Sequence, residues 1–299
     1  MEIHLFIIWS KGLFKQQEII SDIKLSFDIL YITSISWKKD KFAENLSRLY
    51  GQNLPEDSNK ERHCGNDAFS CIIVRDNNPR YKSRKTSKGD RVVNINLFDS
   101  KQLYRSWTGG GHKIHATDNV QEAKFQIMLL LGISYNSYLE IKDNKKMDHY
   151  RHDTLIGENG WESLESLFCA LNEAFQYVIL RNFELLDDEL NCDHPDIDLL
   201  VDDIIGVSNL LNAKKVSRKK DRVQHQVFIA GKLINLDLRF VGDNYYCRSW
   251  QDKILSNRVK ERYYFRPNLK DYYYSLLLHA LFHKPTLRED YKEKLLNLK

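Results

Sequence analysis

The sequence is poor in glycine, proline and cysteine, and it has no long apolar run. Only 13 Gly and 5 Pro occur in 299 residues, which excludes collagen-like and proline-rich architectures. No segment approaches the roughly 18 uninterrupted apolar residues of a membrane span. The five cysteines are an odd number with no C-x-x-C pair, which argues against a disulfide framework and a cysteine zinc site. Residues 1–9 carry an acid where a signal peptide has Lys or Arg. We therefore expect a cytoplasmic protein without a membrane span.

The sequence also lacks a strong excess of one charge. Its 45 basic residues exceed its 41 acidic residues by only four, far below the excess of a dedicated nucleic-acid binder. Any site for a polyanion must therefore be local. With 42% hydrophobic residues the chain can fold, and its length predicts two domains of roughly 150 residues each.

The first half alternates between strand and helix patterns. We expect strands at 3–9 and 27–37, helices at 14–23 and 41–50, and a loop over 52–67. Two further β-rich segments, 69–74 and 92–98, flank an exposed basic tongue at 75–91. This alternation predicts an α/β (α+β) fold. A polar stretch at 142–151 is the expected linker, so the predicted domains are 1–150 and 151–299.

A glycine-rich loop precedes one predicted helix. Gly109-Gly110-Gly111-His112-Lys113 is followed by Asp118 and Gln121, a capping box for a helix that ends at Leu131. Free amides at a helix start attract anions, so Gly110, Gly111 and Lys113 are candidate ligands for the phosphates of a cofactor. Three glycines also make an ordinary turn, and no Walker-type G-K-[ST] follows.

The second half predicts a helix at 162–175 capped by Asn159 and Glu162, strands at 177–180 and 197–201, and a hairpin with arms at 224–229 and 233–240. A strongly apolar helix follows at 272–282. It contains His279 and His283, which we interpret as core or substrate-pocket residues because no H-E-x-x-H pattern accompanies them.

Three aspartates lie on the predicted strands. Asp196 and Asp198 stand two apart, so both point to one face of their strand. Asp237 lies between Leu236 and Leu238, which occupy the opposite, core-facing side. Three carboxylates on neighbouring strands suit Mg²⁺ or Mn²⁺, and such a site promotes phosphoryl and nucleotidyl transfer. Asp196, Asp198 and Asp237 are therefore the candidate catalytic and metal-binding residues, although single D-x-D triplets also arise by chance in solvated turns.

This arrangement resembles the nucleotidyltransferase superfamily with the DNA-polymerase-β-like fold. The resemblance covers about residues 160–290 and is closest to bacterial members that read V-h-L-R-x-h, a short acidic loop, and D-I-D-L-L-V. The matching segments here are residues 177–183, Tyr-Val-Ile-Leu-Arg-Asn-Phe, and residues 196–201. The resemblance implies a mixed sheet flanked by helices, metal binding by Asp196 and Asp198, and a third catalytic carboxylate at Asp237.

The chain departs from this family at the phosphate loop. Members usually carry Gly-Gly or Gly-Ser at a helix start, whereas this chain has Leu180-Arg181-Asn182. Arg181 is a candidate substitute, because a guanidinium can grip phosphate through two hydrogen bonds. Arg239, on the same strand face as Asp237, is a second candidate, with a simple ion pair to Asp237 as the alternative.

These features predict a transferase that uses a nucleotide-activated small-molecule donor and a sugar or glycan hydroxyl in surface-polysaccharide synthesis. Related phosphocholine and ribitol-phosphate transferases vary the same loop, which leaves nucleotidyl and phospho-group transfer both open. The first domain would recognise donor or acceptor. The alternatives are a toxin-like nucleotidyltransferase that modifies RNA through the basic segments 75–91 and 214–222, and a non-catalytic nucleotide- or phosphate-binding module.

Overall fold

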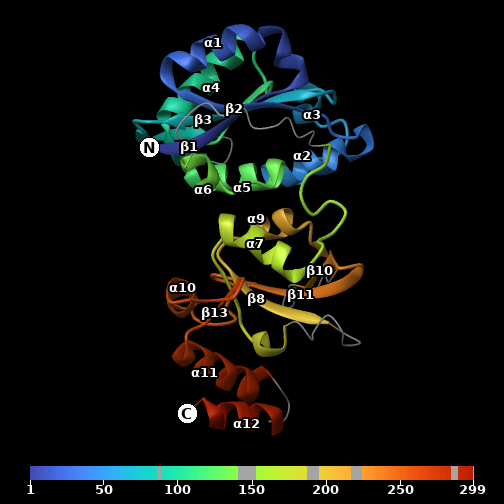
Figure 1. The fold of residues 1–299 in the computed structure, drawn as a ribbon, viewed down its shortest axis with the longest axis vertical. Coiled ribbons are helices and arrows are strands. Elements are labelled where there is room, and N and C mark those ends of the chain that lie inside the picture. The colour runs from blue at the N-terminus through green and yellow to red at the C-terminus, as the bar shows by residue number, and fades with distance from the viewer. Residues whose placement is uncertain (87–88, 141–152, 187–194, 217–223, 284–288, 299) are drawn as a thin grey trace. The chain divides into compact units, whose positions relative to one another are not determined.

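The computed structural model describes the chain except residues 87–88, 141–152, 187–194, 217–223, 284–288 and 299 (Figure 1). It is an α/β fold whose contacts form two compact units, Met1–Ile156 and Gly157–Lys299. The expected linker, 142–151, lies outside the described residues. None of the described helices combines the length and apolar character that a membrane crossing requires.

Unit 1 is built on a four-stranded antiparallel sheet in the order β2-β3-β1-β6. Its strands are β1 (Glu2–Ile8), β2 (Asp28–Ile35), β3 (Phe69–Asp76) and β6 (Ile114–Ala116). Its helices are α1 (Gln16–Ser26), α2 (Phe42–Tyr50), α3 (Asn59–Cys64), α4 (Ile95–Trp107), α5 (Val120–Leu131) and α6 (Tyr135–Leu139). A separate hairpin, β4 (Tyr81–Thr86) and β5 (Gly89–Asn94), projects from the sheet.

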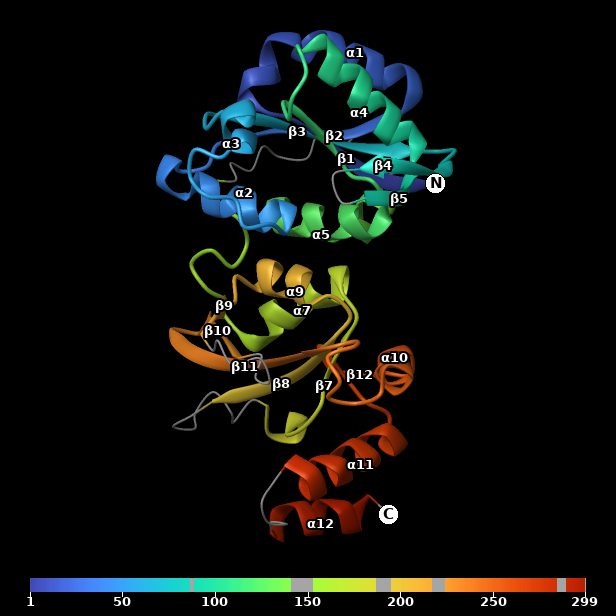
Figure 2. The ribbon, with the colours of Figure 1, turned by 180° about the vertical axis from the view of Figure 1, so that it is seen from behind.

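The central strands of unit 1 are buried on both faces. Helices α1 and α4 cover one face, and α5 lies on the other (Figures 1 and 2). On the α1–α4 face, Phe6 packs with Ile23 and Tyr104 in one apolar cluster. Burial on both sides explains why β1 is a continuous apolar run rather than an alternating one.

Two elements of unit 1 differ from the sequence expectation. Residues 52–67 were expected to form a loop, but α3 forms there because the Ser58 side chain accepts a hydrogen bond from the Glu61 amide. The segment expected as a strand at 92–98 changes to helix at Ile95, because the Asn94 side chain caps α4 through the Asn96 amide. The β-rich sequence propensity was overridden by capping.

The start of α5 also differs from the predicted capping box. Asn119 is the N-cap and accepts a hydrogen bond of 2.9 Å from the Glu122 amide. The carboxylate of Asp118 instead accepts a hydrogen bond from the buried ammonium of Lys101. The predicted cap was therefore wrong by one residue, although the helix ends at Leu131 as expected.

Unit 2 contains a five-stranded mixed sheet in the order β7-β8-β11-β10-β9. Its strands are β7 (Tyr177–Ile179), β8 (Asp196–Val201), β9 (Lys214–Lys215), β10 (Gln224–Ile229) and β11 (Lys232–Phe240), and β12 (Val259–Glu261) and β13 (Tyr264–Arg266) form a small second sheet. Its helices are α7 (Leu164–Ala174), α9 (Ile204–Leu211), α10 (Arg248–Ser256), α11 (Leu269–Leu278) and α12 (Glu289–Asn297). A π-helical turn, His279–His283, continues α11.

The helices of unit 2 lie differently against the two faces of its main sheet. Helices α7 and α9 lie on one face (Figures 1 and 2). On the other face, Val178 and Leu200 pack with Ile254 and Leu255 of α10. Helix α7 is capped by Ser163, which forms a capping box with Ser166, and not by the predicted Asn159 and Glu162.

Candidate functional site

The pairing of β8 with β11 places two of the predicted carboxylates side by side. These strands are parallel, and their register pairs Asp198 with Asp237 and Asp196 with Asn235. Paired residues point to the same face of a sheet, and alternate residues along each strand share that face. Ile197 and Leu199 point to the opposite face and are buried. The structure therefore brings Asp196, Asp198 and Asp237 onto one face, as the sequence predicted.

Arg181 forms a two-point ion pair with Asp198. Its Nη2 lies 2.6 Å from Oδ1 and its Nε lies 3.1 Å from Oδ2 of the carboxylate. The side chain of Arg181 is 4% exposed and that of Asp198 is 15% exposed. Burial acts to lower the pKa of Arg181, but the adjacent Asp198 charge raises it above its ordinary value. The predicted phosphate ligand is thus a charged, buried partner of a predicted catalytic carboxylate.

Tyr245 connects Arg181 to a second arginine. Arg181 Nη1 donates to Tyr245 Oη at 3.1 Å, and Tyr245 Oη lies 3.0 Å from His279 Nδ1. The guanidinium of Arg239 lies over the Tyr245 ring, 4.3 Å from its centroid. Burial raises the pKa of Tyr245, so its hydroxyl stays protonated at neutral pH. Sequence reasoning missed Tyr245, because no motif links it to an arginine 64 residues away.

Arg239 pairs with Asp237, the alternative left open by the sequence. Its Nη2 lies 3.4 Å from Asp237 Oδ2, and its Nη1 lies 3.9 Å from Asp243 Oδ2. The Asp237 side chain is 21% exposed, more than that of Asp198. Each of these two carboxylates thus has its own arginine.

The chemistry of the three carboxylates fits a divalent cation. Across the described residues, no group of three or more His, Cys, Asp or Glu is gathered as a metal site would need. The donors themselves are all oxygens on one face, which is what Mg²⁺ and Mn²⁺ prefer. Each carboxylate oxygen has two lone pairs, so a cation could share the Asp198 oxygens with the two hydrogen bonds from Arg181. Asp196, Asp198 and Asp237 therefore remain the predicted metal ligands.

The glycine loop of unit 1 closes one helix rather than opening the next. Gly109, Gly110 and Gly111 all have positive φ, between 78° and 82°. The amides of Gly109 and Gly110 donate to Ser106 and Arg105 carbonyls at the end of α4. Strand β6 then separates the loop from α5. The expectation of free amides at a helix start was wrong, since these two amides already cap α4.

Lys113 also bonds within this loop, where its ammonium donates to the Thr108 carbonyl. The loop nevertheless lies beside a basic cluster, defined here as Lys60, His63, Arg105 and His112. The rings of His63 and His112 are 5.5 Å apart, and a Cβ on Gly111 would come within 3.0 Å of His63 Nδ1. Lys60 lies 3.6 Å from the centroid of the Tyr50 ring. Arg105 donates from Nε to the Ile114 carbonyl at 2.9 Å.

The electrostatics of the basic cluster favour an anion. Burial, and then the positive charges of Arg105, Lys60 and His63, lower the pKa of His112 to about 4. Burial also lowers the pKa of Arg105. A bound anion would offset the positive charges of Arg105 and Lys60 that act on His112. Of these four residues, only His112 belonged to a motif recognised in the sequence, because α3 and α4 bring the others together in space.

No family model and no curated protein matches the chain. Twelve chains of solved structures do match. One is the nucleoside diphosphate kinase of Encephalitozoon cuniculi, with 13% identity, 45% of this chain and 95% of that chain covered, and a TM-score of 0.29. Another is the nucleoside diphosphate kinase of Aquifex aeolicus, with 13% identity, 42% and 92% covered, and a TM-score of 0.28. Similarity at this level carries no argument about function.

Proposed function

We propose that unit 2 is a metal-dependent transferase. It moves a nucleotidyl or phospho-group from a nucleotide-activated donor to a sugar or glycan hydroxyl, in surface-polysaccharide synthesis. The observation that carries this proposal is the register of β8 and β11, which aligns Asp198 with Asp237 on the face that also holds Asp196. Transfer of a phosphate to a hydroxyl is promoted by a bound divalent cation and a nearby base. Three carboxylates on one face of the sheet could hold the cation and provide the base.

The residues around the carboxylates have distinct roles in this proposal. Asp196, Asp198 and Asp237 hold Mg²⁺ or Mn²⁺, which when bound polarises the donor phosphate and lowers the pKa of the attacking hydroxyl. Arg181 fixes the orientation of Asp198 through its two hydrogen bonds. Arg239, with 13% of its side chain exposed, is the better placed of the two arginines to meet a phosphate.

The basic cluster in unit 1 is the second part of this proposal. Lys60 and Arg105 supply positive charge, and His112, which is neutral at pH 7, adds a hydrogen-bonding group to the cluster. We assign phosphate recognition to the side chains of this cluster. We propose that the reaction takes place in the cytoplasm, as expected from the odd number of cysteines and the lack of a C-x-x-C pair.

The proposal is tested by product formation from nucleoside triphosphates and CDP-activated alditols, with sugar acceptors and Mg²⁺ or Mn²⁺, followed by ³¹P NMR. We expect turnover that needs the metal and that falls about 100-fold or more in Asp237→Asn. Asp198→Asn should be equally inactive, but it leaves the buried Arg181 without its counter-charge, which costs about 3–5 kcal/mol of stability. Asp237→Asn is therefore the decisive variant, since the Asp237–Arg239 pair is more exposed.

A matched control is Asp252→Asn, an exposed aspartate on α10, which should retain full turnover. Equal activity in Asp237→Asn and the wild type would contradict the transferase assignment. Protection of RNA with a steep salt dependence, and transfer to RNA rather than sugar, would point instead to the RNA-modifying alternative.

The second candidate, a non-catalytic nucleotide- or phosphate-binding module, is favoured by one observation. Both Asp198 and Asp237 are already neutralised by arginines. If the protein is such a binding module, nucleotides would raise its unfolding temperature in the absence of metal, and no product would form from any donor. The transferase proposal expects the stabilisation by nucleotide to require Mg²⁺ or Mn²⁺.

A further inference from the structure

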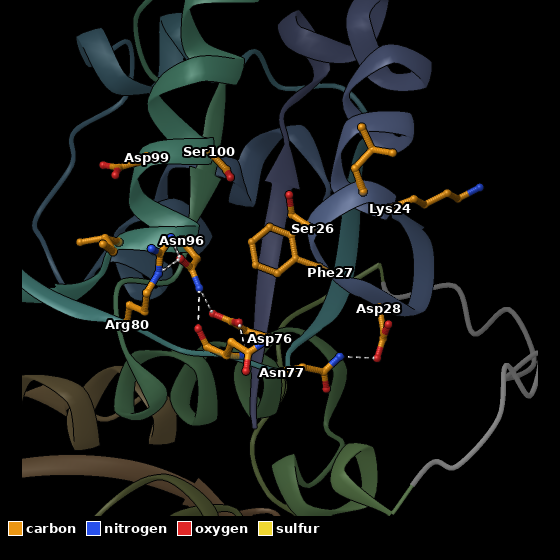
Figure 3. A pocket seen from close by; sticks show the side chains of 13 residues that line it. Lys24, Ser26, Phe27, Asp28, Asp76, Asn77, Arg80, Asn96, Asp99 and Ser100 are labelled. Carbon is orange, nitrogen blue, oxygen red and sulfur yellow. Dashed lines mark hydrogen bonds between the residues drawn. The ribbon is translucent and has the colours of Figure 1, made fainter.

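A polar pocket in unit 1 is separate from the carboxylates and from the basic cluster. It has a volume of about 620 Å³, within the range of small-molecule sites. It lies between the end of α1, the end of β3 and the start of α4 (Figure 3). Ten of its thirteen lining residues are polar, which leaves only Leu25, Phe27 and Ile95 as apolar lining.

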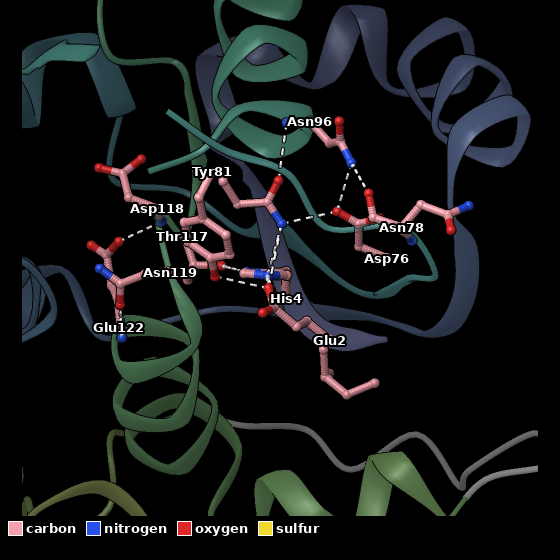
Figure 4. A network of polar contacts seen from close by, with 12 residues as sticks. Glu2, His4, Asp76, Asn78, Tyr81, Asn96, Thr117, Asp118, Asn119 and Glu122 are labelled. Atoms are coloured by element: carbon pink, nitrogen blue, oxygen red, sulfur yellow. Dashed lines mark hydrogen bonds and ion pairs between the residues drawn. The ribbon is translucent and has the colours of Figure 1, made fainter. Parts of the chain in front are cut away.

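One wall of the pocket is held rigid by a buried hydrogen-bond network. Asp76 is 2% exposed, and its Oδ2 accepts from the side-chain amides of Asn94 and Asn96, each at 2.9 Å. Asn96 Oδ1 in turn accepts from Arg80 Nε and Nη2, at 3.1 and 2.9 Å. Figure 4 shows this network continuing behind the pocket to His4 and Glu2. The wall is therefore oriented before any ligand binds.

The opposite side of the pocket is more exposed. Asn77 Nδ2 donates to Asp28 Oδ2 at 2.9 Å, and both residues are open to solvent. Figure 3 shows the Phe27 ring between the polar groups of α4 and those at the end of α1. A ligand here would meet amide and guanidinium donors, carboxylate and amide acceptors, and a small apolar surface.

This composition selects a class of ligand. Three aspartates against Lys24 and Arg80 give no positive excess, so a phosphate or nucleotide is disfavoured. The polar lining disfavours a lipid. A sugar or alditol fits, because each of its hydroxyls donates and accepts a hydrogen bond, and its C–H groups can pack on Phe27 and Leu25.

We propose that the pocket bounded by Asp28, Asp76, Asn77 and Asn96 binds a neutral polyhydroxylated ligand, a sugar or an alditol. The suggestion that this ligand is the acceptor rests on the proposed transferase function, whereas binding itself is measured without turnover. The two claims can therefore fail separately.

The experiment titrates the full-length protein with ribitol, glycerol, glucose and N-acetylglucosamine at millimolar concentration. Saturation-transfer NMR detects binding of the ligand. Changes in the side-chain amide signals of Asn77 and Asn96 show whether the ligand binds in this pocket. We expect saturable binding of at least one polyol. It should be weakened about tenfold or more in Asp28→Ala, which removes a hydrogen bond to a charged group, and by a smaller factor in Asn77→Ala, which removes a hydrogen bond between neutral groups. Both residues are exposed, so these variants should fold.

Two controls separate this inference from others. Asn53 is an exposed asparagine outside the pocket, and the Asn53→Ala variant should bind the polyol as the wild type does. The Asp237→Asn variant should also bind the polyol normally, although we expect it to lose transfer activity. Three results would overturn the inference: no saturable binding of any of the four polyols, an affinity in both pocket variants equal to that of the wild type, or a stronger response of the two amides to inorganic phosphate or Mg²⁺ than to any polyol.

Discussion

At the scale of single residues, charged side chains at both candidate sites depend on neighbours far away in the chain. Asp198 is held by Arg181, and His112 lies among Lys60, His63 and Arg105. A carboxylate with a two-point guanidinium partner and an imidazole among cations are opposite electrostatic situations. The ion pair stabilises the charged form of Arg181, and the cations around His112 stabilise the neutral form of its imidazole.

His112 should make stability depend on pH. Its pKa is about 4 in the folded protein and near 6.5 in the unfolded chain, so the unfolded state binds more protons between these values. The free energy of unfolding should therefore fall as pH drops from about 6.5 to about 4. Urea unfolding across this range measures how the free energy of unfolding depends on pH. In His112→Gln this dependence should be smaller than in the wild type, by an amount that corresponds to at most about one proton.

Part of the slope should remain in that variant, because burial also holds the pKa of His115 well below its usual value. Above pH 7 the variant and the wild type should have parallel pH dependence, since His112 is neutral in both states. Inorganic phosphate should stabilise the wild type more at pH 5 than at pH 7, because a nearby anion favours protonated His112. Identical slopes in variant and wild type would show that folding does not lower the pKa of His112.

At the scale of elements, helix starts are set by single capping side chains. Asn94, Asn119 and Ser163 each accept a hydrogen bond from an amide in the first turn of the helix that follows. Several polar residues near each start could serve as caps, and only one has the extended backbone and reach to do so. This is why the sequence located the helices of residues 120–131 and 164–174 but assigned their caps wrongly.

Ser163→Ala should lower the free energy of unfolding by about 1 kcal/mol, because it breaks the capping box of α7. Glu162→Ala, at the neighbouring exposed position named by the sequence prediction, should cost less than about 0.5 kcal/mol. Urea unfolding of both variants gives the comparison. The opposite order of the two effects would mean that Glu162 is the cap in solution.

At the scale of the whole molecule, each unit has its own sheet and its own apolar clusters. Phe6 and Tyr104 belong to a cluster of unit 1, whereas Val178 and Leu200 belong to one of unit 2. The contacts divide the chain after Ile156, and Arg48 holds that end by donating to the Ile156 carbonyl at 2.7 Å. Each unit therefore has what an independently folding domain requires.

Fragments 1–156 and 157–299, made separately, should each unfold cooperatively in urea and give well-dispersed NMR spectra. The fragment 157–299 should retain metal binding at the three aspartates, and the fragment 1–156 should retain polyol binding, because each of these two sites draws its residues from one unit. A fragment that lacks a cooperative transition would show that its unit depends on the other for stability.

The sequence by itself determined the alternation of strands and helices and the face on which each aspartate lies. Asp196 and Asp198 share a face because strand side chains alternate, and Asp237 opposes Leu236 and Leu238 for the same local reason. Tertiary structure decided which groups meet. The partners of Asp198 and His112 and the walls of the polar pocket in unit 1 depend on strand register and helix packing between segments distant in the chain. Local periodicity carries no information about such contacts, because they are selected by the burial and hydrogen bonding of the folded chain as a whole.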